Sequence, residues 1–109
     1  MIATEPMKEK IAEIARKYDI ALFVLFGSQA TEQTHKKSDV DIGFLSPDDL
    51  DYRKRYELSQ ELSRVFKHPE VEVAHLDMVS PELKKQVADQ GILLYQKNLF
   101  TFDLFKIHA

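Results

Sequence analysis

The continuous apolar run IALFVLF, residues 20–26, limits the possible folds of this chain more than any other feature of the sequence. Seven consecutive apolar residues, most of them β-formers, are typical of a strand that is covered on both faces. The sheet that contains this strand must then be mostly buried. The run ends at Gly27-Ser28, where Gly27 lets the backbone turn tightly.

The rest of the chain supplies helices and further strands. Apolar residues at steps of three and four predict helices, and short β-rich runs predict strands. SPDDL, residues 46–50, resembles a helix start, with Ser46 as the cap and Pro47 at the first helical position. The predicted order is a helix over 4–18, strand 20–26, a short exposed helix and loop over 29–38, strand 39–45, a long helix over 46–66, strand 71–76, a helix over 80–91 and strand 92–96. This order predicts an α/β (α+β) domain with a central mixed sheet of about four strands and helices packed against it.

Length and composition set the remaining bounds. A chain of 109 residues, 44% of them hydrophobic, suits one domain over 1–109, with an apolar tail over 97–109 that either packs back or meets a partner. A net charge of -3 argues against a protein that coats nucleic acid. Without cysteine there is neither a disulfide nor a thiolate metal site, and without a long apolar run we expect no membrane span. These features favour a cytoplasmic protein.

Two carboxylates, Asp39 and Asp41, lie inside the predicted strand 39–45. Side chains alternate along a strand, so both project from one face while Val40 and Ile42 project from the other. Two neighbouring carboxylates that are half-buried favour a divalent cation, and an all-oxygen ligand set indicates magnesium or manganese. A solvent-facing pair on an edge strand, with no metal, is the alternative.

Gly27-Ser28 and Glu72 strengthen the metal interpretation. Gly27 permits a tight turn, and Ser28 at the start of a short helix would aim backbone N–H groups at a phosphate, although an ordinary capped turn has the same sequence. Glu72 lies between Val71 and Val73 in the third predicted strand, either on an exposed sheet face or turned toward the site. If that strand neighbours strand 39–45, Glu72 joins Asp39 and Asp41 around one or two cations. The four histidines show no ligand spacing, which favours structural or solvated roles.

These residues carry a family resemblance. The run LFGSQATEQTHKKSDVDIGFL, residues 25–45, resembles the signature of the DNA polymerase beta-like nucleotidyltransferase superfamily: Gly-Ser, ten residues, then Asp-x-Asp. The chain as a whole is similar to the minimal nucleotidyltransferases over residues 7–96, and VEVAHLDMVSPELKKQVADQGILLYQ matches their third-carboxylate strand, the helix after it and their last strand. The resemblance implies the nucleotidyltransferase fold.

The resemblance also implies residue roles. At the family's corresponding positions, Gly27 and Ser28 would hold the triphosphate of ATP or another nucleotide. Asp39 and Asp41 would bind two Mg²⁺ ions. Glu72 would complete the metal site and assist deprotonation of the acceptor. Two positions depart from the family pattern: Glu72 replaces the usual Asp, and Glu32 stands where the family has a glycine.

The function implied by the resemblance is magnesium-dependent transfer of AMP from ATP to a hydroxyl. Minimal nucleotidyltransferases commonly act as antitoxins of helical HEPN-domain toxins, and some attach AMP to a toxin tyrosine. The resemblance thus implies a toxin–antitoxin pair, with no direct nucleic-acid binding and no membrane contact. A non-catalytic antitoxin that neutralises its partner by docking, and a small-molecule nucleotidyltransferase of the aminoglycoside type, remain the alternatives.

Overall fold

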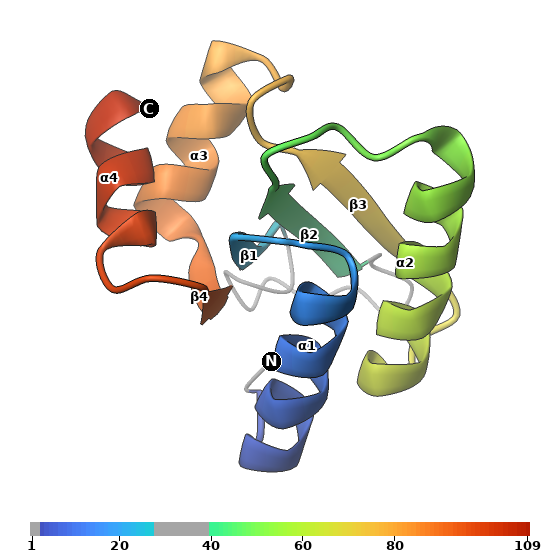
Figure 1. Cartoon of the computed structure of the whole chain (residues 1–109). Coiled ribbons are helices and arrows are strands. Elements are labelled where there is room, and N and C mark those ends of the chain that lie inside the picture. Colours follow the sequence, from blue (N-terminus) through green and yellow to red (C-terminus); the bar gives the residue numbers. More distant parts are fainter. Residues whose placement is uncertain (1–2, 28–39) are drawn as a thin grey trace.

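A computed structural model describes residues 3–27 and 40–109 of the chain. Helices and strands alternate along most of this length (Figure 1). The elements are α1 (Glu5–Lys17), β1 (Leu22–Phe26), β2 (Val40–Leu45), α2 (Tyr52–Phe66), β3 (Val71–His75), α3 (Pro81–Gln90), β4 (Ile92–Gln96) and α4 (Thr101–His108). The α/β class is therefore confirmed. The predicted short helix over 29–38 lies outside the described residues.

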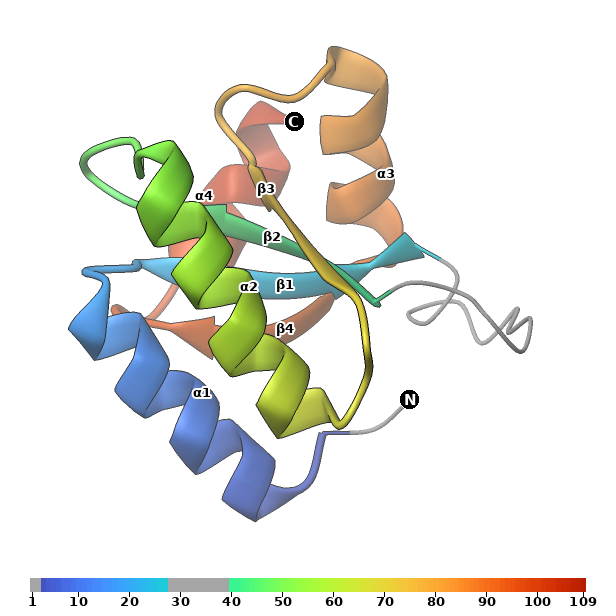
Figure 2. The same ribbon diagram turned by 90° about the vertical axis from the view of Figure 1, so that its right-hand side faces the viewer.

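The four described strands form a mixed sheet in the order β3-β2-β1-β4. β1 pairs antiparallel with both β2 and β4, whereas β2 pairs parallel with β3. The parallel pair requires a crossover connection, which α2 provides. Two views at right angles show α1 and α2 against one face of the sheet and α3 and α4 against the other (Figures 1 and 2). The sheet is thus the middle of three layers.

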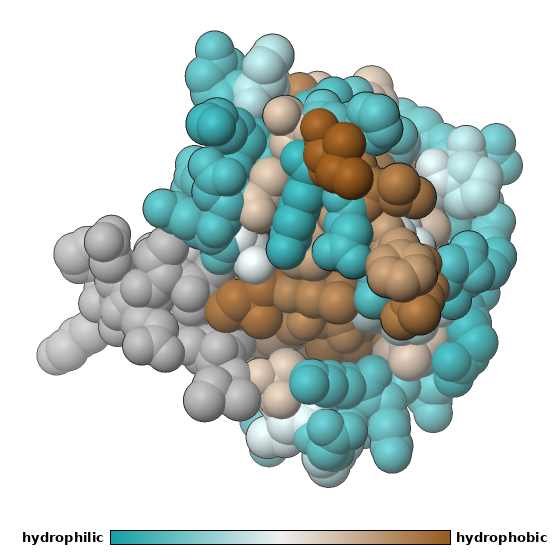
Figure 3. All heavy atoms as spheres, turned by 90° about the vertical axis from the view of Figure 1, so that its left-hand side faces the viewer, coloured by the Kyte–Doolittle hydropathy of each residue, from teal (hydrophilic) through white to brown (hydrophobic). Residues whose placement is uncertain are grey.

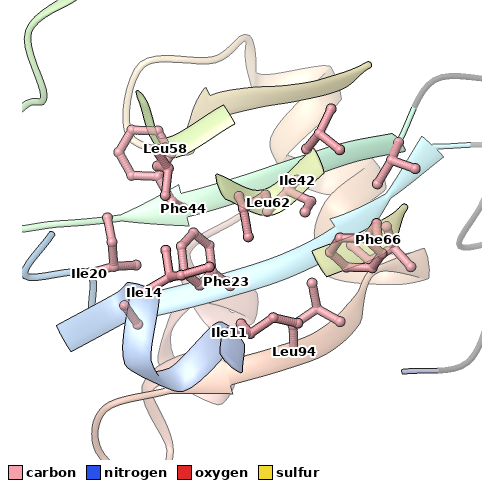
Figure 4. Close-up of a cluster of buried hydrophobic side chains, with 14 of the residues drawn as sticks. Ile11, Ile14, Ile20, Phe23, Ile42, Phe44, Leu58, Leu62, Phe66 and Leu94 are labelled. Carbon is pink, nitrogen blue, oxygen red and sulfur yellow. The ribbon is translucent and has the colours of Figure 1, made fainter. Parts of the chain in front are cut away.

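Every residue of β1 is buried, as its continuous apolar run predicted. Alternate residues of the strand enter two different cores: Phe23 and Leu25 join the cluster beneath α1 and α2, shown in Figure 4. Leu22, Val24 and Phe26 join the cluster beneath α3 and α4. The strand is apolar at each position because both of its faces are covered.

The start of α2 corrects one prediction. The helix begins at Tyr52, after an N-cap at Asp51, and not at Ser46. The Asp51 carboxylate accepts a hydrogen bond of 2.8 Å from the backbone N–H of Lys54, while the Ser46 hydroxyl bonds to the backbone carbonyl of Asp48. Because the Ser46 hydroxyl serves a local turn, the segment 46–51 stays non-helical and Leu50 enters the core.

The apolar tail forms α4, and one side of that helix packs back on the domain. Phe102 is buried in the cluster beneath α3 and α4, and Phe105 packs partly against it. The opposite side stays exposed at Leu104 and Ile107. Across the described part of the chain, no helix is long and apolar enough to cross a membrane.

Candidate functional site

Two of the three predicted carboxylates lie side by side at one end of the β2–β3 pair. Asp41 is the register partner of Glu72 in the parallel ladder. The residues that flank Asp41 in β2 and Glu72 in β3 pack into the α1/α2 core, so both carboxylates project from the opposite face of the sheet. The sequence left open whether the third strand neighbours the second, and the strand order now meets that condition.

Gly27 brings the turn after β1 against Asp41. Its φ angle is +79°, in the left-handed region that favours glycine. A Cβ atom built on Gly27 would lie 2.4 Å from Oδ2 of Asp41, closer than any real contact of this kind. The backbone of the glycine turn and the Asp41 carboxylate therefore approach each other in a way that no residue with a side chain permits.

The helices on this face leave the acidic end of the sheet open. The side chains of Leu22 and Val24 are completely buried in the α3/α4 core, while Phe26, the register partner of Asp41, is 7% exposed. Asp41 is half-buried and Glu72 is exposed. Both carboxylates are therefore accessible to solvent at the edge of a well-packed core.

The donor chemistry of this end suits a hard cation. Both side chains offer carboxylate oxygens, which magnesium prefers, and like charges on neighbouring strands repel unless a cation lies between them. Within residues 3–27 and 40–109, no group of three or more histidine, cysteine, aspartate or glutamate residues is arranged to hold a metal ion. The other predicted ligand Asp39, the predicted phosphate contact Ser28, and Glu32 lie outside the described residues.

The opposite end of the same strand pair holds a polar cluster that the sequence did not indicate. His75 is only 7% exposed and stacks on Phe44, with ring centroids 4.9 Å apart and an interplanar angle of 7°. Its Nδ1–H donates to Oδ1 of Asp49 over 3.1 Å, and the Arg55 guanidinium donates to the same oxygen over 2.7 Å. The hydrogen bond from Arg55, followed by the charges of Arg55 and His75, holds the pKa of Asp49 below its usual value.

This second cluster has a structural role. The ring of His75 packs on Phe44 and lies beside two aspartates, Asp49 and Asp77. These contacts agree with the structural role that the sequence favoured for its histidines. The cluster fixes the segment after β2 to the end of β3. The long sequence separation between Asp49 and His75 hides the pairing from any local motif.

The fold is an α/β domain whose mixed sheet carries two helices on each face. At one end of the sheet, a glycine turn and neighbouring carboxylates form an acidic site. The family model described as polymerase beta, nucleotidyltransferase matches residues 9–99. The chain belongs to this nucleotidyltransferase family.

One curated relative and two solved structures show which members of the family this chain is similar to. The chain is 37% identical over 76 residues to protein adenylyltransferase MntA of Shewanella oneidensis, a match that covers 70% of this chain and 54% of that protein. The chain thus spans about half the length of this relative. It also resembles a toxin–antitoxin complex with AMP-PNP, at 32% identity and a TM-score of 0.76 over 93% of this chain and 82% of the other.

The second structure is a complex between tri-AMPylated Shewanella oneidensis HEPN toxin and MNT antitoxin. This chain is 29% identical in sequence to the matching chain of that complex, with a TM-score of 0.72. The match covers 95% of this chain and 81% of the other. These values confirm the resemblance to minimal nucleotidyltransferases and the fold that it implied.

Proposed function

We propose that this chain is a magnesium-dependent nucleotidyltransferase that moves AMP from ATP to a hydroxyl and acts as the antitoxin of a toxin–antitoxin pair. One observation carries the proposal: the turn at Gly27 lies against Asp41, which is in register with Glu72 on the neighbouring strand. A backbone turn that can face phosphates and a carboxylate pair that can face cations together suit a metal-bound nucleotide.

Each residue has a distinct proposed task. Asp41 and Glu72, together with Asp39, would hold Mg²⁺, while Gly27 and Ser28 would place backbone N–H groups along the triphosphate. Bound Mg²⁺ would stabilise the charge that develops on the attacking oxygen and on the departing pyrophosphate. Glu72 is exposed, so its carboxylate is accessible to an incoming acceptor and would take the proton of the acceptor hydroxyl.

The proposed acceptor is a tyrosine of a HEPN-domain toxin. Support comes from the relatives: one is named a protein adenylyltransferase, and a structure at 29% identity contains a toxin that carries AMP. The open end of the sheet suits such an acceptor, because a side chain presented by a folded partner must reach the site from solvent. ATP is the proposed donor, in line with the AMP-PNP complex.

The test measures label transfer and neutralisation in the same mixtures. The protein is incubated with labelled ATP, Mg²⁺ and the product of the adjacent reading frame, alongside the double variant Asp39→Ala/Asp41→Ala. Asp48→Ala is the matched control, because this exposed aspartate lies in the segment after β2, beyond the strand end opposite to Asp41. We expect label on the partner with the wild type and the control, and none with the double variant.

The outcomes separate catalysis from docking. Label transfer that disappears in the double variant together with neutralisation supports the enzyme. Neutralisation that survives in the double variant, with no label transfer by any of the proteins, would replace the proposal with the non-catalytic antitoxin. Label on an aminoglycoside, with none on the protein partner, would favour the small-molecule enzyme.

A further inference from the structure

The chain carries tyrosines of its own, the type of acceptor that the proposed reaction uses. It contains four of them, and all lie in the part that the structure describes: Tyr18, Tyr52, Tyr56 and Tyr95. An acceptor must bring its phenolic oxygen in line with the reacting phosphorus, so its ring has to be free to enter an active site. The surroundings of each tyrosine decide which of them meets this condition.

Two of the four tyrosines are held inside the fold. The Tyr18 hydroxyl donates a hydrogen bond to the Glu61 carboxylate and so joins α1 to α2. Burial, then the hydrogen bond to Glu61 and the charge of that carboxylate, raises the pKa of Tyr18, which makes its hydroxyl harder to deprotonate. Tyr95 in β4 is half-buried and packs against the core beneath α1 and α2. Neither ring can enter the site of another molecule unless the fold opens around it.

The other two tyrosines lie one turn apart on α2, and they differ in exposure. Tyr56 is 62% exposed and lines a hollow together with Tyr18 and Glu61. Tyr52 is 90% exposed, the highest value among the exposed large hydrophobic side chains of the described residues. It is the first residue of α2, directly after the N-cap Asp51. Tyr52 therefore projects into solvent from a corner of the fold.

Tyr52 and the acidic site of the same molecule lie on opposite faces of the sheet. Asp41 and Glu72 project on the face that carries α3 and α4, whereas α2 packs on the other face. Figure 2 shows α1 and α2 in front of the sheet, and Figure 3 shows the opposite side, where apolar side chains gather among hydrophilic ones. Asp41 is also near the start of β2, while α2 follows the other end of that strand. Tyr52 can therefore reach only the site of a second copy.

We propose that Tyr52 is an acceptor for AMP, and that one copy of this chain transfers AMP to Tyr52 of another copy. This inference rests on the proposed nucleotidyl transfer and adds a second protein acceptor to it. The phenolic oxygen of Tyr52 attacks the α-phosphorus of ATP in the other copy and forms a new oxygen–phosphorus bond. The bond from this phosphorus to the bridging oxygen breaks and pyrophosphate leaves. The phenolic proton passes to Glu72 of the copy that holds the ATP.

An anionic group at this position is compatible with the fold. Tyr52 lies at the N-terminal end of α2, where the helix dipole favours negative charge. The first turn of this helix contains no acidic residue, and Arg53 and Lys54 are exposed cations directly after Tyr52. The phosphate of an attached AMP therefore adds a charge that the start of the helix tolerates, and the modified protein stays folded.

The protein alone, with labelled ATP and Mg²⁺ but without a partner, tests the inference. We expect label on the wild type, located at Tyr52 by peptide mass spectrometry, and none on Tyr52→Phe. Tyr56→Phe is the matched control, because it removes the other exposed tyrosine hydroxyl of α2, and it should be labelled like the wild type. Tyr52→Phe should still label the product of the adjacent reading frame, since Tyr52 lies outside the acidic site.

A mixture of two variants tests transfer between copies. Tyr52→Phe keeps the acidic site and lacks the acceptor, whereas Asp41→Asn keeps the acceptor and lacks one carboxylate of the site. Neither should label itself, but the mixture should place label on the Asp41→Asn chain, which supplies the only peptide with Tyr52. For dilute wild type, a tenfold rise in protein concentration should raise the initial rate about 100-fold, against about tenfold for transfer within one molecule.

Acetylation by N-acetylimidazole tests the exposure of the tyrosine hydroxyls without any nucleotide. In the folded protein Tyr52 should react fastest and Tyr56 next, while Tyr18 and Tyr95 should be protected until the protein is unfolded. The same measurement on Asp41→Asn checks that this variant presents Tyr52 as the wild type does.

The outcomes separate this inference from the proposed function. Label on the partner protein, with none on the chain alone, would overturn the inference and leave nucleotidyl transfer standing. No label on either protein would overturn both. Label at a residue other than Tyr52, an initial rate that rises only in proportion to protein concentration, or a Tyr52 that resists acetylation in the folded protein would each overturn the assignment of Tyr52 as an acceptor between copies.

Discussion

The two ends of the β2–β3 pair contrast sharply, although the same two strands build both. At the end with Asp41 and Glu72, two like charges are register partners on an open face. At the other end, Phe44 and His75 are register partners, and both are buried and stacked. Asp49 and Arg55 then supply opposite charges around the His75 ring.

The difference separates the proposed metal site from a cluster whose charges are paired within the fold. Beside His75, Asp49 and Arg55 form an ion pair of 2.7 Å within the fold, with no ligand needed between them. Asp41 and Glu72 bring two carboxylates to paired positions on neighbouring strands, an arrangement that a bound cation would stabilise. We therefore expect changes at the first end to affect catalysis and changes at the second end to affect folding.

Asp41→Asn should have the largest effect and should leave the fold intact. Loss of one carboxylate from the proposed metal site is expected to reduce AMP transfer by about 1,000-fold. The free energy of unfolding should change by less than about 1 kcal/mol, because the substitution is isosteric and removes a like-charge neighbour of Glu72. Single-turnover label transfer and urea unfolding, measured on the same preparation, check both values. A large loss of stability would show that Asp41 is structural.

Phe44→Ala should give the opposite result. Phe44 is completely buried and stacks on His75, so its truncation leaves a cavity and is expected to cost about 3 to 5 kcal/mol of stability. Transfer per folded molecule should stay close to that of the wild type. Urea unfolding measures the loss, and transfer rates are normalised to the folded fraction. A rate per folded molecule that falls tenfold would show that the two ends are coupled.

Glu72→Asp tests the length of the proposed third ligand. Glu72 carries one methylene more than the residue usual in the family, and misplacement of a reacting group by about 1 Å can cost 10²-fold in rate. Shortening the side chain is therefore expected to raise the transfer rate by up to about tenfold. Glu72→Gln is the control, since it keeps the length and removes the charge. A Glu72→Asp variant slower than the wild type would mean that the rest of the site is adapted to glutamate.

The sequence predicted most of these elements because their signals are local. The apolar run of β1, the alternation around Asp41 and the Ser80-Pro81 helix start each act over a few residues, and the structure confirms them. The predicted start of α2 was wrong because Ser46 and Asp51 are both good N-cap residues. Leu50, which lies between them, packs in the core. The local turn at Ser46 and the packing of Leu50 both accompany the start at Asp51.

The features that the sequence missed depend on contacts between distant residues. The Asp49–His75 pair joins positions 26 apart, and no spacing rule connects them. The neighbourhood of Asp41 and Glu72 could be stated only as a condition, because the strand order decides it. The sequence predicted a turn at Gly27. Its close approach to the Asp41 carboxylate could not be predicted, because it depends on how the strands fold together.

The smallest expected effect is a pH dependence at the compensated end. The hydrogen bond and charge of Arg55, with His75, lower the pKa of Asp49 in the folded protein below its value in the unfolded chain, about 4. Ionised Asp49 therefore contributes stability above that unfolded value, and the contribution is lost as the pH falls through the folded value. Asp49→Asn keeps the acceptor for the His75 Nδ1–H but removes the charge.

Thermal unfolding from pH 7 to pH 2.5 tests this contribution. The wild type should melt slightly higher than Asp49→Asn at pH 7 and at pH 5, and the two melting temperatures should converge below about pH 4, where the wild-type carboxylate becomes protonated. Asp48→Asn provides the reference for loss of an exposed carboxylate from the same segment. A difference between wild type and Asp49→Asn that stays constant down to pH 2.5 would assign the effect to packing, and the contrast between the two strand ends would then rest on Phe44 and His75 rather than on charge.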